Sequence, residues 1–169
     1  LNTGATNGNV TMSSTINGST DLDIISGTGS VAIQGVIGGS AALSSLDINS
    51  TAGQTGTIEV FDIGDGDPNP AVTGLTRLGN ANTTTLTLDG SDYDFGAGVT
   101  FGSATYTQNA GTGVFDVNNG PVSFLGNVVT NGTFSVDSNG GDITVAGNIS
   151  ATNATDTVSL SDGGGSGTI

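Results

Sequence analysis

Residues 8–24 read GNVTMSSTINGSTDLDI and residues 29–48 read GSVAIQGVIGGSAALSSLDI, so one pattern is written twice in succession. Each copy opens with a glycine, continues into a triplet with two apolar residues around a small or polar one, and ends in Leu-Asp-Ile. Apolar residues two apart have the period of a β-strand, so both side chains point to one side. The Gly, Asn and Ser residues between triplets favour turns. The doubled stretch therefore predicts short strands joined by tight corners.

The pattern continues through the rest of the 169 residues. First triplets begin at 10, 31, 58, 99, 122 and 143, second triplets begin at 22, 46, 86, 115, 134 and 158, and residues 167–169 open a seventh repeat. Such a repeat predicts the rungs of a parallel β-solenoid, in which equivalent triplets stack about 4.8 Å apart. We expect one all-β domain over residues 1–169, with six to seven rungs. A third, weaker face would be formed by Ile16, Ile37, Val128 and Ile149.

An antiparallel β-sandwich is the alternative, because short strands with frequent turns fit that fold too. It gives no reason for the matching frames that follow Gly8 and Gly29. One interval between first triplets is long, and we assign its extra length to a loop insertion at residues 61–74 that projects from the rod.

The amino-acid composition argues against several classes of function. The chain has 30 Gly, no Cys, no His, no Trp and one basic side chain, Arg77, against 15 carboxylates, for a formal net charge of -14. Nucleic-acid binding is excluded because phosphate contacts need Lys and Arg. No apolar run is long enough to insert into a membrane. Few side chains suited to acid–base or nucleophilic chemistry are present, so we expect no enzyme.

The densest group of acidic residues lies in the insertion, where Gly64 and Gly66 permit a tight backbone. Calcium prefers oxygen ligands on short loops of this kind, and a solvated acidic loop is the alternative. The predicted ligands are Asp62, Asp65, Asp67 and Asn69.

A second acidic group, Asp89, Asp92 and Asp94, lies between two triplets. Here we favour turns, because Asp side chains at corners hydrogen-bond their own backbone. Arg77 is expected to pair with an acidic loop.

The two copies at residues 8–24 and 29–48 resemble the strand repeats of filamentous haemagglutinin-like exoproteins and related bacterial surface adhesins. The resemblance covers most of the chain as a degenerate repeat. It implies a right-handed parallel β-helix, secretion to the cell surface, and a structural or adhesive role.

The sequence thus predicts a stiff, non-catalytic rod of an extracellular fibre or adhesin stalk, either a segment of a longer chain or a filament subunit. Its expected partners are flanking repeats or copies of itself stacked end to end. Two other functions remain open. One is recognition of a glycan or host surface through the insertion, and the other is a donor-strand-exchange pilin with the sandwich fold.

Overall fold

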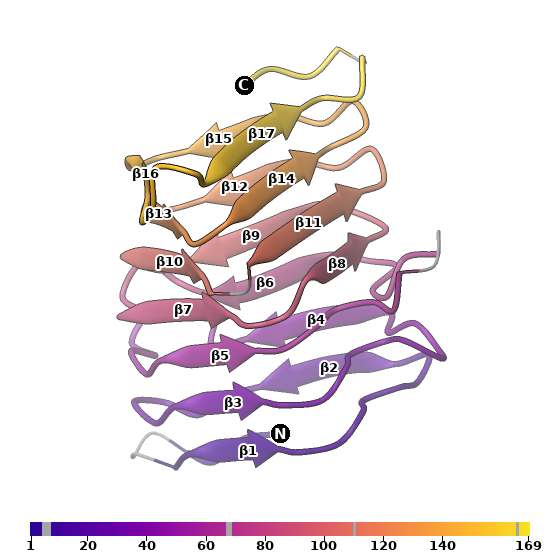
Figure 1. Cartoon of the computed structure of the whole chain (residues 1–169). Helices are drawn as coiled ribbons and strands as arrows, with labels where there is room; N and C mark the ends of the chain where they lie inside the picture. Colours follow the sequence, from indigo (N-terminus) through magenta and orange to yellow (C-terminus); the bar gives the residue numbers. More distant parts are fainter. Residues whose placement is uncertain (5–7, 67–68, 110, 165) are drawn as a thin grey trace.

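The computed structural model describes residues 1–4, 8–66, 69–109, 111–164 and 166–169. Over these residues the chain is a coil whose strands lie across its axis and stack turn upon turn (Figure 1). Every pair of named strands is parallel. The predicted parallel β-solenoid is confirmed, with about seven turns, and the antiparallel sandwich is wrong.

The strands form three sheets, one on each side of the coil. Sheet 1 has seven strands: β1 (Val10–Met12), β3 (Val31–Ile33), β5 (Ile58–Val60), β7 (Thr85–Leu88), β10 (Thr105–Gln108), β13 (Asn127–Thr130) and β16 (Ile149–Ala151). Sheet 2 has six: β2 (Asp21–Ile24), β4 (Ser45–Ile48), β6 (Thr76–Gly79), β9 (Val99–Gly102), β12 (Val122–Phe124) and β15 (Ile143–Val145). Sheet 3 has four: β8 (Asp92–Phe95), β11 (Thr112–Val117), β14 (Thr133–Asp137) and β17 (Thr157–Ser161).

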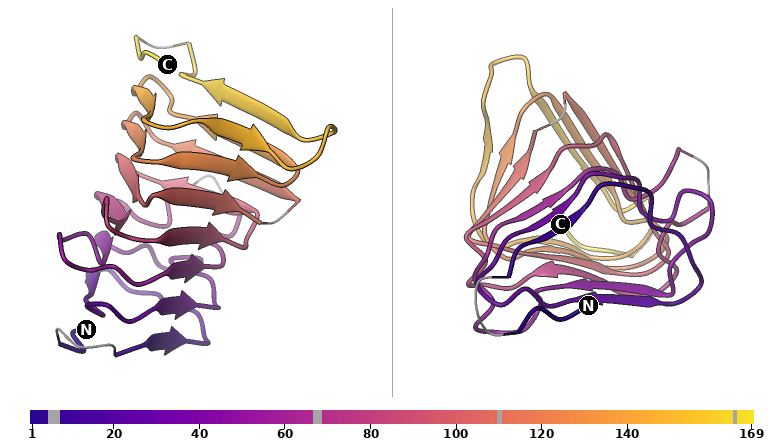
Figure 2. Two further views of the ribbon diagram at one scale, coloured as in Figure 1. Left: turned by 90° about the vertical axis from the view of Figure 1, so that its left-hand side faces the viewer. Right: turned by 90° about the horizontal axis from the view of Figure 1, so that it is seen from below.

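The coil is right-handed, which is the hand that the family resemblance implies. In Figure 1 the strands of sheet 1 run from left to right in front, those of sheet 2 return behind, and the chain rises from its N-terminal turn. Seen along the axis, the three sides enclose a roughly triangular cross-section (Figure 2). Right-handed connections between parallel strands are strongly preferred because strands twist to the right.

The stacking of the predicted triplets needs correction from the third turn onward. The triplets at 58 and 86 are not two sides of one rung, because Ile58 is the register partner of Leu86 and both lie in sheet 1. The triplet at 99 continues sheet 2, where Val99 pairs with Thr76 of β6. The register partners along sheet 1 are Val10, Val31, Ile58, Leu86, Tyr106, Val128 and Ile149, which are 21, 27, 28, 20, 22 and 21 residues apart.

The third side is more complete than predicted. Ile16 and Ile37 lie on it and pair through isolated bridges, whereas Val128 and Ile149 belong to sheet 1. The first turns have only such bridges on this side, and strands β8, β11, β14 and β17 replace them in the later turns. The segment 61–74 also belongs partly to this wall, because Ile63 and Val72 are buried and bridge to β8. The insertion that leaves the wall is thus shorter than predicted.

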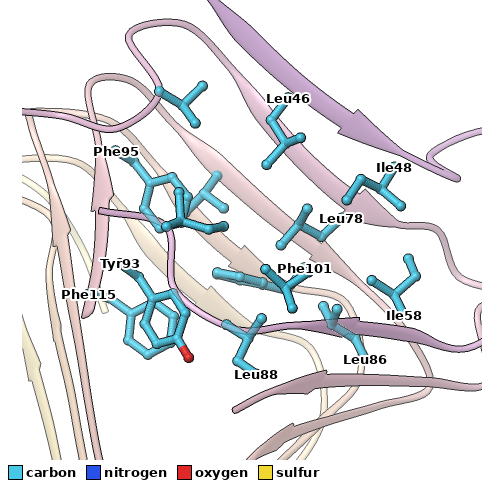
Figure 3. Packing of buried hydrophobic residues seen from close by; sticks show 14 of the residues in the cluster. Leu46, Ile48, Ile58, Leu78, Leu86, Leu88, Tyr93, Phe95, Phe101 and Phe115 are labelled. Carbon is cyan, nitrogen blue, oxygen red and sulfur yellow. The ribbon is translucent and has the colours of Figure 1, made fainter. Parts of the chain in front are cut away.

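A continuous apolar core fills the coil and changes character along it. Aliphatic side chains dominate the first turns, and stacked aromatic rings occupy the later ones (Figure 3). Phe101 of β9 stacks on Phe124 one turn away, with ring centroids 4.7 Å apart, and Tyr93 stacks on Phe115 at 4.6 Å. Because parallel strands in register place equivalent side chains one above another, the aromatic rings stack along the coil axis.

A tyrosine hydroxyl buried in this aromatic region has a hydrogen-bond partner. The Tyr106 hydroxyl donates to Gln108 Oε1 at 2.7 Å, and Gln108 Nε2 donates to the Gly90 carbonyl at 3.0 Å. Burial raises the pKa of Tyr106 well above its ordinary value, so its hydroxyl stays protonated as a donor.

Glycine columns let successive corners approach closely. Gly8, Gly29 and Gly56 stack at the corner before sheet 1, which explains the glycine that opens each sequence repeat. A Cβ on Gly29 would lie 2.6 Å from the Gly8 carbonyl carbon, and a Cβ on Gly56 would lie 1.8 Å from the Gly29 carbonyl oxygen. The spacing between turns therefore leaves no room for a side chain here.

An asparagine ladder satisfies the buried backbone at the corner between sheets 2 and 1. Asn49, with a positive φ of 48°, accepts from the Ser26 amide at 2.8 Å and donates to the Ser26 hydroxyl at 2.7 Å. One turn later, Asn80 Nδ2 lies 2.7 Å from the Asn49 carbonyl oxygen, 2.9 Å from that of Thr51 and 2.8 Å from that of Gln54. The side chains thus supply donors and acceptors where the turning backbone lacks strand partners.

Replacing Asn80 with alanine is expected to lower the free energy of unfolding by about 3 kcal/mol, because buried carbonyl groups lose their donor. Asn82 is the control, because it is exposed and only its backbone amide contacts Asn80, at 2.8 Å. Asn82→Ala should change stability by less than about 0.5 kcal/mol. Chemical denaturation of both variants measures the difference, and equal values would show that the ladder contributes nothing.

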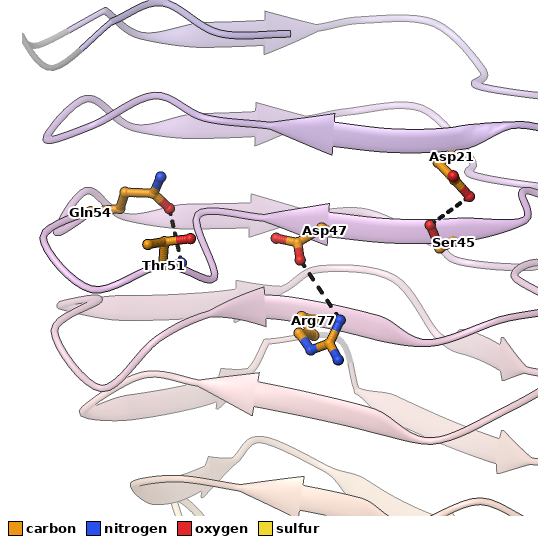
Figure 4. A network of polar contacts seen from close by, with 6 residues as sticks. All are labelled: Asp21, Ser45, Asp47, Thr51, Gln54 and Arg77. Atoms are coloured by element: carbon orange, nitrogen blue, oxygen red, sulfur yellow. Dashed lines mark hydrogen bonds and ion pairs between the residues drawn. The ribbon is translucent and has the colours of Figure 1, made fainter.

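The outer surface carries small polar side chains that join one turn to the next. In Figure 4, Ser45 donates to Asp21 of the preceding turn at 2.8 Å, and Arg77 of β6 lies 4.0 Å from Asp47 of β4. Arg77 therefore pairs with a strand residue rather than with an acidic loop. This exposed pair adds at most about 1 kcal/mol.

Candidate functional site

The structure brings the two predicted acidic groups together on the third side of the coil. Ile63 bridges to Tyr93, which places Asp62 and its neighbours one turn below Asp92. Asp62, Asp65 and Asp92 line a shallow open depression together with Val36, Gly64, Gly66, Ser91, Thr112 and Val114. Asn69 lines a neighbouring depression with Asp65. Asp67, the remaining predicted calcium ligand, lies outside the described residues.

Asp62 has a structural task at this place. Its Oδ1 accepts hydrogen bonds from the Ser91 amide at 2.7 Å and the Asp92 amide at 3.1 Å. The carboxylate thus satisfies the backbone where β8 begins, because those amides have no strand partner in the turn below. The sequence pattern placed Asp62 in a projecting loop, and this contact across one turn was not predicted.

Asp92 is partly buried in the depression and lies near other carboxylates. Burial raises the pKa of its carboxyl above the ordinary value, and a hydrogen bond from the Gly66 backbone opposes this rise. The charges of Asp62, Asp65 and Asp116 raise the pKa further. Asp92 is consequently a carboxylate whose ionised form is disfavoured in the folded chain.

A second acidic feature, absent from the sequence analysis, runs up sheet 3. Asp94, Asp116 and Asp137 are register partners in successive strands, and we call them the acidic ladder. Asn139 moderates the repulsion, because its Nδ2 donates to Asp116 Oδ1 at 2.8 Å and its amide donates to Asp137 Oδ1 at 3.0 Å. An apolar residue followed by aspartate recurs in β8, β11 and β14, and this was the available signal.

Asp89, the remaining member of the second predicted group, lies apart from the depression. It accepts from Asn109 Nδ2 at 2.8 Å. Burial raises the pKa of Glu59, and the charge of Asp89 adds to that rise. Asp89 therefore contacts a side chain 20 residues away, and Asp92 and Asp94 lie in strand β8, so the turns predicted for these two residues are wrong.

Within the described residues, no three His, Cys, Asp or Glu side chains are arranged to hold a metal ion. Calcium binding by the segment that contains Asp67 stays a prediction, which calorimetric titration of the chain with Ca²⁺ would check.

Replacing Asp92 with asparagine is expected to stabilise the chain at neutral pH by less than about 1 kcal/mol, since the group is partly solvated. The raised pKa of Asp92 means that the folded state binds its proton more tightly than the unfolded state does. Wild-type chain therefore recovers stability as the pH falls through that pKa, and the advantage of Asp92→Asn shrinks. Denaturation at neutral and acidic pH measures this, with Asp23→Asn as the control for net charge. An advantage that grew in acid would contradict the assignment.

No helix in the described part of the chain is long and apolar enough to cross a membrane. Comparison with family models, with curated proteins and with solved structures gave no match to this chain.

Proposed function

We propose that this chain is a segment of a stiff, non-catalytic rod in an extracellular fibre or adhesin stalk at a bacterial cell surface. The observation that carries the proposal is the continuity of the three sheets along the coil axis. Each inner turn pairs its backbone with the turns on both sides, in registers that keep equivalent residues aligned. In such a structure stability and length both increase with each added repeat.

The core supports the same function. Buried side chains on all three sides form one cluster that extends from Val10 to Ile143. Because the interior is continuous, bending the coil at any turn would open a gap between stacked side chains. The continuous core therefore favours a coil that is stiff along its axis.

The charge of the outer surface favours contact with water and opposes contact with nucleic acid. The net charge is -14 with one Arg, so the outer surface of the coil repels anionic surfaces. It also repels other copies of the chain that approach from the side. The resemblance of residues 8–48 to the strand repeats of haemagglutinin-like exoproteins supports an extracellular place.

Immunogold labelling of the cells that make this chain tests the proposal. Antibodies raised against the recombinant chain should label fibres or a coat outside the cell envelope. Label confined to the cell interior would overturn the extracellular rod.

A second candidate function is recognition of a glycan or a host surface protein by the third side. Phe61 is 41% exposed and immediately precedes Asp62 of the acidic depression. An exposed aromatic ring beside carboxylates is a combination that sugars bind through stacking and hydrogen bonds. Glycan-array binding that Phe61→Ala removes would favour this function, and equal binding of both proteins would oppose it.

A further inference from the structure

Several asparagines of this chain stand directly before a glycine, a pair in which the side-chain amide can react with the backbone. Glycine favours the reaction because it has no side chain to shield its amide nitrogen. The asparagines of these pairs are Asn7, Asn17, Asn119, Asn131 and Asn139. Asn7 lies outside the described residues, and the other four are all exposed. Because the four share the same pair of residues and are all exposed, differences in their reactivity come from their hydrogen bonds.

Two of the four side chains are held by a neighbouring turn. Asn17 Oδ1 accepts hydrogen bonds from two backbone amides of the next turn at 2.9 and 3.3 Å. The Gly18 amide, which is the nitrogen that would attack, donates to the Ala41 carbonyl at 3.1 Å. Asn131 Oδ1 accepts from Asn153 Nδ2 at 3.2 Å. Both side chains must therefore leave their partners before they can react.

The other two asparagines form a matched pair at the corner between sheets 3 and 2. They lie in successive turns and both have a positive φ, 57° at Asn119 and 47° at Asn139. Asn139 Nδ2 donates to Asp116 Oδ1 at 2.8 Å and lies 3.3 Å from the Val117 carbonyl oxygen. Among the described residues, neither the Asn119 side chain nor the Gly120 amide has a hydrogen-bond partner. Both reacting groups are thus unrestrained only at Asn119.

We propose that Asn119 is a site of spontaneous covalent modification, at which its side chain cyclises onto the Gly120 amide and reopens as aspartate or isoaspartate. Hydroxide removes the proton from the Gly120 nitrogen, which attacks Cγ of Asn119. A new C–N bond closes a succinimide ring, and the side-chain nitrogen leaves as ammonia with a proton from water, which restores the hydroxide. The reaction does not depend on the proposed rod function.

Water then opens the succinimide by adding to one of its two carbonyl carbons and breaking the bond from that carbon to the Gly120 nitrogen. Opening at Cγ gives aspartate with an ordinary backbone. Opening at the backbone carbonyl gives isoaspartate, in which the main chain runs through the former side chain. Either product adds a negative charge to a chain whose net charge is already -14.

The isoaspartate product does not fit this corner of the coil. It lengthens the main chain beside Gly120, where successive turns are in close contact. A Cβ on Gly120 would lie 2.4 Å from the Gly98 amide nitrogen, and a Cβ on Gly141 would lie 2.1 Å from the Gly120 carbonyl oxygen. Modification of Asn119 therefore weakens the stacking of these turns as the protein ages.

Ageing of the purified, folded chain at mildly alkaline pH tests the proposal, with the other three sites as internal controls. Peptide mapping by mass spectrometry detects the exchange of NH2 for OH at each asparagine, and an isoaspartyl methyltransferase labels the isoaspartate. Conversion at Asn119 should be faster than at Asn17, Asn131 and Asn139 by about tenfold or more, the ratio expected when hydrogen bonds must break first. In urea the four rates should become similar.

A variant of the acidic ladder tests the role of the hydrogen bond. Asp116→Ala removes the acceptor of Asn139 Nδ2, so conversion at Asn139 should rise about threefold to tenfold while that at Asn119 stays unchanged. Asp116 is exposed in β11, and circular dichroism establishes that the variant is folded. An unchanged rate at Asn139 would show that hydrogen bonding does not control these sites and would overturn the proposal.

The structural consequence has its own control. Wild-type chain should lose stability to denaturant as it ages, whereas Asn119→Gly should not, because glycine keeps the positive φ and has no amide to cyclise. Equal rates at the four sites of the folded chain, or fastest conversion at a site other than Asn119, would overturn the assignment. Neither result bears on the extracellular rod, which immunogold labelling tests separately.

Discussion

Replacing Gly56 with alanine is expected to lower the free energy of unfolding by about 3 kcal/mol, because a methyl group has no space between two turns. Its Cβ would lie 1.8 Å from the Gly29 carbonyl oxygen and 2.5 Å from the carbonyl carbon. Both contacts are with backbone that is itself paired in the coil, so no side-chain rotation relieves them. Chemical denaturation of the variant measures the loss.

Gly111 provides the matched control for this substitution. A Cβ built on Gly111 meets no atom within 4 Å, and its φ is not in the left-handed region. Gly111→Ala should therefore be neutral or stabilise the chain by about 0.4–1 kcal/mol, because alanine restricts the unfolded state. If both substitutions had the same effect, close stacking of the turns would not be the reason that position 56 requires glycine.

The second large effect is expected for Phe101→Ala, which should reduce stability by about 3–5 kcal/mol. The Phe101 ring is fully buried and lies at the centre of the aromatic region. It stacks on Phe124 and meets Tyr106 and Phe115 with ring centroids 5.4 and 5.6 Å away. Removing it leaves a cavity that the paired strands of sheet 2 cannot close.

Phe61→Ala is the control, because it removes the same ring from a site that is 41% exposed. It should reduce stability by less than about 1 kcal/mol, and both values come from the same denaturation experiment. A small effect at Phe101 would mean that the core is loosely packed in the aromatic turns.

The repeat in residues 8–48 was sufficient to predict the parallel coil. Glycine at the corner and apolar residues two apart are direct requirements of closely stacked turns, so they are visible in the sequence. Gly8 and Gly29 do stack, and the triplets that begin at 10 and 31 are register partners.

The order of stacking in the middle turns was predicted wrongly for a physical reason. At three inward positions the chain has Thr76, Tyr93 or Tyr106 in place of an aliphatic residue, and all three are buried. A triplet with an inward hydroxyl does not resemble an apolar triplet, so β6, β8 and β10 were missed. Of the three hydroxyl groups, that of Tyr106 donates a hydrogen bond to Gln108.

The candidate site was harder to predict because it depends on the length of one turn. Asp62 and Asp92 are 30 residues apart in the sequence, which is one turn of the coil at this place. The Asp62 carboxylate therefore reaches the Asp92 amide of the next turn. The predicted interval of 41 residues between the first triplets at 58 and 99 placed both segments within one rung, so their stacking on successive turns was missed. The buried roles of Asn49 and Asn80 were not predicted for another reason. Asparagine is frequent in this chain, and no neighbouring residue distinguishes a buried asparagine from an exposed one.

Electron cryo-microscopy of the native material tests the rod most directly. We expect extended fibres in which strands lie across the axis and repeat along it at about 4.8 Å. Discrete globular particles, or subunits joined by exchanged strands, would contradict it.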